Sequence, residues 1–591
     1  MKKIFLFLVA LVCAVTTNLF ATEGALNGKF TVNADGKKVQ FSQGNLQYQA
    51  STQIWRFAEG SGTKATGEAA HAEGLKINGI WYELNESELT ASVTGSGTEE
   101  DVYSGDIVIP ETVNYEEKTY TVNSLSGDGM FSSNDNITSI SIPKTIVSIY
   151  TEWNSFSFCS KLTAINVDAE NLYYSSVDGV LFNKAKSELL AYPGGKAGAY
   201  TIPSSVTTLS NEAFSGSAEL TELTISAGVT EIGTDAFGYC EKLTAINVVT
   251  GNPKYSSEDG VLFNKAKTLL IACPGGKSGT YAIPASVTEL EWYSFSGNVG
   301  LTSVTFPASL KQISVGAFFG CTALKSVSIP ATIDTIKDGA FYECTALTSL
   351  TIAEGVKCIE GQAFEYCTAL TEVTLPASVD TLGYCVFRFN QMNAIHVAAG
   401  SASFCDIDGI LFNKDVTTLV QYPGAKAAEY IIPSTVTKIE SGSFAESRVT
   451  KVVIPDGVEE IVYYTFRECR DMTSLTIGSG MKNLGGRAFS YCTGLKEITC
   501  RSTTPPIQGF LVFEGLSIED MKTIPLYVPA ESISAYKDDI NWRKFDVQDK
   551  TDTAIESVDA MQVNSTCKII RNGRVIIVCG GKEYNVLGVE L

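Results

Sequence analysis

A repeat with a period of about 23 residues is the feature that most constrains this chain. The string DGAFYECTALTSLTIAEGV, residues 338–356, returns one step later as GQAFEYCTALTEVTLPASV, residues 361–379, so that Phe341 falls on Phe364. A unit this short cannot bury its own apolar side, so each unit must stack on its neighbours. For a chain of 591 residues, a prior of about 150 residues per domain would predict about four domains. The repeat predicts one long array instead.

Phenylalanine opens the repeat along most of the chain, and the usual step is the one from Phe318 to Phe341. These residues are Phe131, Phe156, Phe214, Phe237, Phe295, Phe318, Phe341, Phe364, Phe387, Phe444, Phe466 and Phe489. Three steps are larger and contain the same additional text: SSVDGVLFNKAKSELLAYPGGK from Ser175, SSEDGVLFNKAKTLLIACPGGK from Ser256 and CDIDGILFNKDVTTLVQYPGAK from Cys405. Each insertion has two apolar runs around a polar turn such as 183–187, which predicts a β-hairpin that adds to the sheet.

Each ordinary unit contains one short strand pattern. Val327 and Ile329 alternate with Ser326 and Ser328, which is the two-residue period of a half-buried strand. Pro330 ends this strand because proline cannot donate to a ladder. Successive coils are therefore expected to stack in register about 4.8 Å apart, with Phe over Phe and Leu over Leu.

The unit F-x-x-C-x-x-L-x-x-[IV]-x-[IL]-P-x-x-[VI]-x-x-[IL] resembles the BspA-like leucine-rich repeat of bacterial and protist surface proteins. The resemblance covers roughly Ile77 to Phe545 and implies a leucine-rich-repeat solenoid, a β-rich right-handed superhelix of parallel coils of about 23 residues with hairpin insertions. The segments INGIWYELNES and YSGDIVIPETV resemble the usual first coils, and LYVPAESISAYKDDINWRKF resembles the closing cap, with Tyr536, Trp542 and Phe545. The array with its caps is therefore assigned to residues 76–548.

Two segments precede the array. Residues 1–21 form a secretory signal pattern, with Lys2 and Lys3 before an apolar run. A lipoprotein signal would use Cys13, but this would cut the apolar run short. Residues 22–75 look like a small β-rich leader. The mature protein is therefore expected to be secreted or held on the outer cell surface.

The last segment, residues 549–591, is expected to be a linker followed by a hairpin tail. Asn572 and Gly573 stand between two apolar runs, which is a strong hairpin signal. The final GKEYNVLGVEL resembles the C-terminal sorting tails of proteins exported by the type IX secretion machinery. The alternative is a simple terminal hairpin.

The charge of the chain restricts its partners. The formal net charge is −21, and loss of the signal peptide with Lys2 and Lys3 makes it −23. Nucleic acid and anionic membranes need clustered Lys and Arg, so we expect neither nucleic-acid binding nor membrane insertion. Extracellular proteins or glycans remain as partners, and we expect a monomer. Solubility of an exported protein also explains the acidity.

Catalytic motifs are missing from the sequence. There is no GxSxG elbow, no HExxH and no P-loop, and His71 and His396 are the only histidines. We therefore expect no enzyme activity, no metal and no cofactor. A glycosidase needs only a carboxylate pair, which the sequence does not exclude.

Cysteines and Asp-Gly pairs have structural explanations. Seven cysteines hold one repeat position that elsewhere carries Ser or Asn, so we expect buried free thiols, since stacked side chains rarely have disulfide geometry. Cys567 and Cys579 differ, because a hairpin turn would set them opposite each other. They could therefore form a disulfide or remain free thiols. The Asp-Gly pairs that recur in the insertions lack the ligand series of a calcium loop, so we expect turns.

A polar column on the strands is the candidate binding surface. Its members lie between the two buried residues of each strand and are small, polar and mostly uncharged: Asn166, Thr224, Asn247, Thr305, Ser328, Thr351, Thr374, His396, Thr476 and Thr499, with Val453 as an apolar member. A curved array would present them as one continuous ribbon that hydrogen-bonds an extended peptide or a glycan. The alternative is that Thr simply suits an exposed strand face. Tyr173, Tyr174, Tyr255 and Tyr281 are expected to add exposed aromatic surface.

The family resemblance implies adhesion to host matrix or cell-surface proteins. A glycan-binding role in polysaccharide use is the first alternative, and a polymer-degrading enzyme is the second. The fold is far better constrained by the repeat than the ligand is.

Overall fold

The computed structural model describes residues 75–95, 102–127, 130–150 and 155–549, together with the backbone of short strands nearer the two ends. Contacts divide the chain into two units, Met1–Glu73 and Gly74–Leu591. The first unit has two small antiparallel sheets, β1-β4-β5 and β2-β3, formed by Gly24–Ala25 (β1), Phe30–Ala34 (β2), Lys37–Phe41 (β3), Leu46–Gln49 (β4) and Ile54–Phe57 (β5). The expected signal peptide, residues 1–21, lies outside the described residues.

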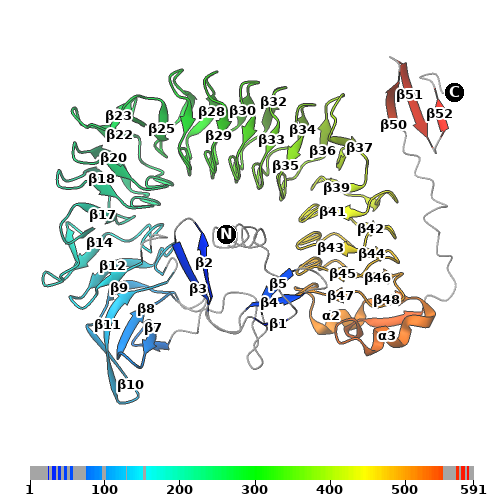
Figure 1. The fold of residues 1–591 in the computed structure, drawn as a ribbon, viewed down its shortest axis with the longest axis horizontal. Helices are drawn as coiled ribbons and strands as arrows, with labels where there is room; N and C mark the ends of the chain where they lie inside the picture. Colours follow the sequence, from blue (N-terminus) through cyan, green and yellow to red (C-terminus); the bar gives the residue numbers. More distant parts are fainter. Residues whose placement is uncertain are drawn as a thin grey trace. The chain divides into compact units, whose positions relative to one another are not determined.

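The second unit is a solenoid of parallel coils, as the repeat predicts (Figure 1). Each coil contributes one short strand to a row of parallel strands. The strands of this row are Gly105–Val108 (β9), Ile137–Ile142 (β12), Ala164–Val167 (β14), Gly198–Thr201 (β18), Leu220–Ile225 (β20), Ala245–Val248 (β22), Gly279–Ala282 (β26), Leu301–Thr305 (β28), Ser326–Ile329 (β30), Ser349–Ile352 (β32), Glu372–Leu375 (β34), Ala394–Val397 (β36), Glu429–Ile431 (β40), Lys451–Val453 (β42), Ser474–Ile477 (β44), Glu497–Cys500 (β46), Pro525–Val528 (β48) and Asp546–Asp549 (β49). In β30 and β32 the register pairs Val327 with Leu350 and Ser328 with Thr351, a shift of one repeat.

A second row of very short parallel strands follows the proline turn of each coil. Its members are Ser148–Ile149 (β13), Thr208–Leu209 (β19), Glu231–Ile232 (β21), Glu289–Leu290 (β27), Gln312–Ile313 (β29), Thr335–Ile336 (β31), Cys358–Ile359 (β33), Thr381–Leu382 (β35), Lys438–Ile439 (β41), Glu460–Ile461 (β43), Asn483–Leu484 (β45) and Ile507–Gln508 (β47). The pairing again joins equivalent residues, such as Ile336 and Ile359. Both rows point their branched residues inward, which explains the spacing of Ile and Val in each unit.

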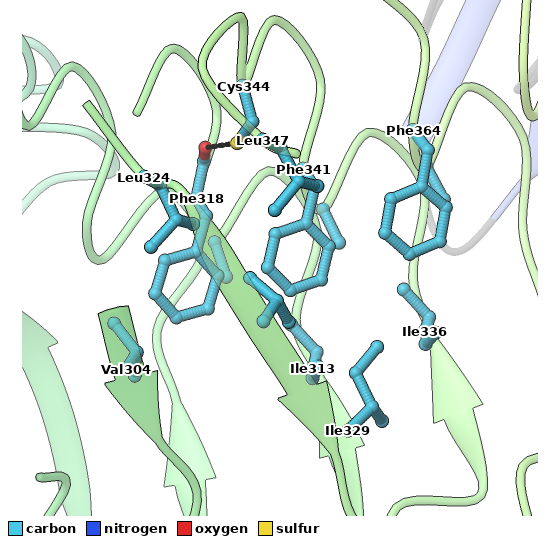
Figure 2. Close-up of a cluster of buried hydrophobic side chains, with 14 of the residues drawn as sticks. Val304, Ile313, Phe318, Leu324, Ile329, Ile336, Phe341, Cys344, Leu347 and Phe364 are labelled. Carbon is cyan, nitrogen blue, oxygen red and sulfur yellow. Dashed lines mark hydrogen bonds between the residues drawn. The ribbon is translucent and has the colours of Figure 1, made fainter. Parts of the chain in front are cut away.

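The phenylalanines stack inside the array, as predicted. The rings of Phe318 and Phe341 are parallel within 3°, with centroids 5.0 Å apart, and those of Phe341 and Phe364 within 2° at 5.2 Å. Figure 2 shows these three rings beside the aliphatic files of Leu and Ile residues. All three side chains are fully buried. The in-register stack thus places identical residues in contact along the axis.

The repeated cysteine is a hydrogen-bond donor. The Cys344 Sγ donates to the Phe318 carbonyl at 3.3 Å (Figure 2). The Cys367 Sγ donates to the Phe341 carbonyl at 3.2 Å. Where Asn390 replaces cysteine, its Nδ2 donates to the Phe364 carbonyl at 2.9 Å. The twelve cysteines among residues 155–549 are free thiols, which confirms the prediction for the repeat position.

The insertions have three strands where the sequence predicted a two-stranded hairpin. The strands are Tyr174–Val177 (β15), Val180–Asn183 (β16) and Glu188–Ala191 (β17) in the first insertion, Tyr255–Glu258 (β23), Val261–Asn264 (β24) and Leu269–Ala272 (β25) in the second, and Phe404–Ile407 (β37), Ile410–Asn413 (β38) and Thr418–Gln421 (β39) in the third. The first strand of each was missed because its residues are mostly polar. The Asp-Gly pairs form the turns after these first strands, with positive φ at both residues, such as Asp178 (50°) and Gly179 (77°).

Each insertion also ends in a coil of its own. The N–H of Tyr192 donates to the Ala213 carbonyl at 2.8 Å, and the N–H of Tyr422 donates to the Ser443 carbonyl at 2.8 Å. These bonds match the bond from the Phe318 N–H to the Ala340 carbonyl in an ordinary coil. Tyr192, Cys273 and Tyr422 therefore take the place of the phenylalanine.

The insertions divide the core into four hydrophobic clusters. In β16, Leu181 packs with the preceding cluster, whereas Val180 and Phe182 pack with the following one. Leu411 and Phe412 separate in the same way in β38. A strand that is buried on both faces has consecutive apolar residues, which explains the sequences VLF and ILF in the insertions.

The two ends of the array are closed by other elements. At the start, a mainly antiparallel sheet contains Leu75–Ile77 (β6), Ile80–Asn85 (β7), Thr90–Val93 (β8), Thr112–Tyr115 (β10) and Lys118–Leu125 (β11). At the end, short helices cover the last coils: Ile518–Thr523 (α2), Ala530–Ser532 (η1), Ile533–Asp538 (α3) and Trp542–Lys544 (η2). Trp542 is fully buried, and its Nε1 donates to the Pro506 carbonyl at 2.8 Å. Tyr536 and Phe545 are buried beside Trp542, as expected of a closing cap.

Three antiparallel strands lie near the C-terminus, formed by Cys567–Arg571 (β50), Arg574–Cys579 (β51) and Lys582–Tyr584 (β52). Asn572 and Gly573 lie outside the described residues, and the strands on either side of them, β50 and β51, pair as an antiparallel hairpin. The register pairs Cys567 with Val578, so the expectation that Cys567 lies opposite Cys579 is wrong by one residue. The sorting function of the tail stays a prediction.

Candidate binding surface

The polar column lies on the solvent face of the first strand row. Each member stands between two inward residues, as Ser328 does between the buried Val327 and Ile329. Asn166, Thr305, Ser328, Thr351, Thr374 and His396 are exposed, and Thr224, Asn247, Val453, Thr476 and Thr499 are half-buried. The structure therefore places every predicted member on the surface of a strand.

Hydroxyl groups in this column are not used by the fold. Among the described residues, Thr224, Thr305, Ser328, Thr351, Thr374, Thr476 and Thr499 have side chains with no hydrogen-bond partner in the protein. A threonine three residues earlier in many coils behaves differently. The Thr348 Oγ1 donates to the Lys325 carbonyl at 3.2 Å, and the Thr302 Oγ1 donates to the Gly279 carbonyl at 3.1 Å. Two files of threonine thus run side by side, and those of the polar column, unlike Thr302 and Thr348, have hydroxyl groups that are free for a ligand.

The column is not one continuous ribbon, which corrects the expectation. The insertions interrupt the first strand row after β14, β22 and β36, so that the members fall on separate sheets. Asn166 lies on the first, Thr224 and Asn247 on the second, and Thr476 and Thr499 on the last. Thr305, Ser328 and Thr351 share one sheet, whereas Thr374 and His396 lie on another, because β32 and β34 are not paired.

The insertions cover the strand edges where the column stops. In the first insertion, the Val167 N–H donates to the Ser176 Oγ at 2.9 Å, so a side chain replaces the next strand of the ladder. In the third, the Val397 N–H donates to the Asp406 Oδ1 at 2.8 Å. The other carboxylate oxygen of Asp406 lies 3.5 Å from the His396 Nδ1. These contacts explain why the edges are closed although the ladder is broken.

The central group has the most uniform chemistry. Strands β28, β30 and β32 have no ionisable residue, and apart from Thr302 each carries two hydroxyl groups outside the core: Ser303 and Thr305, Ser326 and Ser328, and Ser349 and Thr351. The other groups include charged neighbours. The Asn247 Nδ2, for example, donates to the Glu222 Oε1 at 2.5 Å. Three of these six hydroxyl groups belong to the polar column and three lie two residues earlier on the same strands, so together they form an uncharged polar surface.

Some members of the column escaped the sequence analysis. The register pairs Ser141 with Asn166, Thr201 with Thr224, and Thr499 with Tyr527. Ser141 and Thr201 each precede an Ile-Pro pair, as Ser328 does, and this local pattern could have found them. Tyr527 lies on β48, whose coil lacks the phenylalanine spacing of the others.

The aromatic residues of the insertions are less exposed than expected. Tyr173 is exposed, with 51% of its surface accessible. Tyr174, Tyr255 and Tyr281 are half-buried, which contradicts the expectation for these three. Tyr281 packs against Phe295, with ring centroids 6.0 Å apart, and the hydroxyl groups of Tyr174 and Tyr255 bond to the preceding coil.

The buried thiols do not supply a nucleophile. Burial raises the pKa of Cys321 and of Cys367 to about 12, so both stay protonated near neutral pH. Within the described residues, no three His, Cys, Asp or Glu side chains gather in a way that could hold a metal ion. His71 lies outside the described residues.

The in-register coils with Phe, Cys and Leu files define a leucine-rich-repeat solenoid. The chain belongs to the family of the BspA type leucine-rich repeat region, whose model matches 6 copies over residues 116–189, 191–265, 278–399 and 421–530. No curated protein matches the chain. In the described part of the chain, none of the helices has the length and apolar character needed to cross a bilayer.

Solved structures with a similar arrangement are bacterial leucine-rich repeat proteins. One from Eubacterium ventriosum is 20% identical, covers 71% of this chain and 93% of its own, and has a TM-score of 0.36. A leucine-rich cell surface protein from Faecalibacterium prausnitzii is 18% identical, with coverage of 76% and 97% and a TM-score of 0.31. One from Bacteroides ovatus is 20% identical, with coverage of 80% and 99% and a TM-score of 0.27.

Proposed function

We propose that this chain is a non-catalytic binding protein, secreted or held on the outer cell surface, that adheres to host matrix or cell-surface proteins. The chain belongs to a family of repeat proteins, which supports a binding role. A secretory signal pattern in residues 1–21 supports export. Acidic composition disfavours polyanionic partners. Proteins with polar, weakly charged surfaces suit this chemistry better.

The file of free hydroxyl groups is the observation that carries the proposal. Thr305, Ser328 and Thr351 lie on consecutive paired strands, and none of the three has a partner among the described residues. Neighbouring strands are about 4.8 Å apart, so their hydroxyl groups form a regular row of donors and acceptors. A rigid row of this kind loses little side-chain entropy when a partner binds.

Pull-down from extracellular matrix, mucin and bacterial surface extracts tests the proposal. We expect Thr351→Arg and Thr374→Arg to reduce capture of the partner, because each places a large charged side chain on the column. Gln312→Arg is the matched control, since Gln312 is exposed on β29 in the other strand row. Capture that is unaffected by both threonine changes would remove the column as the binding face.

A glycan ligand is the second candidate, and the uncharged central group favours it. Six hydroxyl groups on β28, β30 and β32 can exchange hydrogen bonds with sugar hydroxyl groups without desolvating a charge. A glycan array with signals that Thr351→Arg and Thr374→Arg abolish would support this candidate over protein adhesion. Turnover of any polymer by the purified protein would instead support an enzyme.

A further inference from the structure

A pocket of about 270 Å³ opens where the third insertion leaves the array. Its walls come from the coil before the insertion, the insertion itself and the coil after it, which are the regions of β35, β37 to β39 and β41 in Figure 1. This volume is just below the about 300–1,000 Å³ of pockets for drug-sized ligands, so it suits a single ring.

In the first two insertions, a tyrosine reaches from the insertion to the preceding coil at the equivalent place. The Tyr174 hydroxyl accepts from the Ile149 N–H at 2.9 Å. The Tyr255 hydroxyl donates to the Thr230 carbonyl at 3.2 Å. Burial and the charge of Glu231 raise the pKa of Tyr255, and a hydrogen bond from the Ile232 backbone opposes this shift. At each of these junctions, one tyrosine hydroxyl group thus forms a hydrogen bond with the backbone at the edge of a two-residue strand, β13 or β21.

The third insertion has phenylalanine at this position. Phe404 begins β37 and pairs with Asn413, just as Tyr174 pairs with Asn183 and Tyr255 with Asn264. Phe404 has no hydroxyl group. The edge of β35 is therefore left without the bond that the other two junctions make.

The backbone N–H groups of β35 alternate between the preceding coil and the insertion. The N–H groups of Thr381 and Gly383 donate to the Lys357 and Ile359 carbonyls of the preceding coil, at 3.2 and 2.7 Å. Successive N–H groups of a strand alternate in direction, so the Leu382 N–H points the opposite way. The ladder between β33 and β35 therefore does not use the Leu382 N–H, which faces the insertion.

The remaining walls suit an aromatic ring. Gln421 occupies the position that Ala191 and Ala272 have in the other insertions. Its Nε2 donates hydrogen bonds to the Tyr422 and Ser443 carbonyls. Its Oε1 is left as an acceptor. Glu440 adds a carboxylate to the rim, which disfavours an anionic ligand. Apolar surface comes from Leu382, Val386, Phe404, Leu411 and Val420.

We propose that this pocket binds a neutral phenol, either a small free phenol or the side chain of a tyrosine in a peptide, with its hydroxyl group at the Leu382 N–H. The ligand supplies the group that Tyr174 and Tyr255 supply from within the chain. This site is separate from the polar column, so it does not depend on the adhesive role of that surface.

Binding of N-acetyl-L-tyrosinamide and 4-methylphenol to the full mature chain, measured by ligand-observed NMR, tests the proposal. N-acetyl-L-phenylalaninamide is the matched ligand without the hydroxyl group. We expect the tyrosine amide to bind about two- to tenfold more tightly than the phenylalanine amide, which is the effect of one net hydrogen bond. Binding of 4-methylphenol alone would assign the site to free phenols, and binding of both phenols would include tyrosine side chains.

The variant Phe404→Tyr gives the decisive comparison. It should fold, since two insertions already carry tyrosine there, and its own hydroxyl should occupy the edge and weaken phenol binding at least tenfold. Tyr255→Phe is the control at the second junction and should leave the affinity of the third pocket unchanged. Equal binding of the tyrosine and phenylalanine amides, no binding of either phenol, or unchanged binding to Phe404→Tyr would overturn the proposal.

Discussion

The uninterrupted coils from β28 to β36 and the three insertion junctions are built from the same repeat, but different contacts hold them together. In the uninterrupted coils, the second strand row continues from β29 to β35, the first row is paired except between β32 and β34, and the phenylalanine rings stack in parallel. At the junctions, the first strand row stops and side chains cover its edge, while the last strand of each insertion pairs in parallel with the second row of the next coil. The comparison shows that the repeat specifies the stack, whereas individual residues decide how each break is closed.

The junctions also differ from one another. The Ser157 Oγ donates to the Glu212 Oε2 at 3.3 Å across the first insertion, and the Ser296 Oγ donates to the Asp235 Oδ1 at 2.7 Å across the second. The third has a weaker contact, from the Cys385 Sγ to the Ser441 carbonyl at 3.5 Å. Because Phe404 also lacks the bridging hydroxyl, the third junction has the weakest polar contacts of this kind.

The largest effect should come from removing a ring within the uninterrupted coils. Phe341 has a parallel ring on each side, so Phe341→Ala should lower the free energy of unfolding by about 3–5 kcal/mol. Phe387 stacks on Phe364 alone, at 5.8 Å, and Phe387→Ala should cost less. Urea unfolding followed by circular dichroism measures both, and equal losses would contradict the difference between the two regions.

The carboxyl of Asp235 at the second junction should make the stability of the protein depend on pH. Burial raises the pKa of Asp235 from 3.8 to about 7, while the Ser296 hydrogen bond opposes the shift and Glu212 adds to it. The folded state therefore holds a proton that the unfolded state releases, so stability should fall as the pH rises from about 4 to about 7. At about 1.4 kcal/mol per pKa unit, the loss is at most about 4 kcal/mol.

Asp235→Asn should flatten this part of the pH profile, because asparagine has no proton to lose. Asp334→Asn is the control, since Asp334 is exposed in an uninterrupted coil. Urea midpoints between pH 4 and pH 8 provide the measurement. A slope that persists unchanged in Asp235→Asn would show that this carboxyl is not its source.

The bridging hydroxyl groups should have smaller effects of opposite sign. Tyr255→Phe leaves the edge groups of the second junction unpaired and should destabilise the protein by about 1–3 kcal/mol. Phe404→Tyr adds the missing bond and should stabilise the protein by about 0.5–1.5 kcal/mol. Thermal unfolding of the two variants checks the signs. Destabilisation by Phe404→Tyr would mean that the third junction does not resemble the other two.

The smallest effect on stability should come from the polar column. Thr351 is exposed and makes no hydrogen bond within the described residues, so Thr351→Arg should change the free energy of unfolding by no more than about 0.5 kcal/mol. Thr348→Ala, in the neighbouring file, removes the bond to the Lys325 carbonyl and should cost more, about 0.5–1.5 kcal/mol. The reverse order would show that the column has a structural role.

The sequence predicted the stack because the repeat positions are nearly identical. Phe318, Phe341 and Phe364 must occupy equivalent places in equivalent coils, and the buried cysteine follows from its exchange with Asn390. The closing cap was found from its bulky residues Tyr536, Trp542 and Phe545. Local pattern was sufficient wherever one coil repeats the environment of the next.

Prediction failed where the repeat is broken. The strand that begins at Tyr174 has no apolar alternation, and its place depends on pairing with β16. The division of the polar column follows from hydrogen bonds such as that of the Val167 N–H with Ser176, which no spacing reveals. The exchange of Tyr174 and Tyr255 for Phe404 is visible in the sequence, but its consequence depends on which backbone groups the preceding coil leaves unpaired.

Deletion of one whole repeat tests the central claim most directly, which is that equivalent residues of successive coils stack in register. Removal of residues 341–363 joins Ala340 to Phe364 and should let Phe364 stack on Phe318. We expect this variant to keep the circular dichroism spectrum of the parent and to unfold cooperatively, whereas removal of residues 341–352, about half of a unit, should disrupt the array. If both deletions unfold the protein equally, or if both are tolerated equally, the in-register account is wrong.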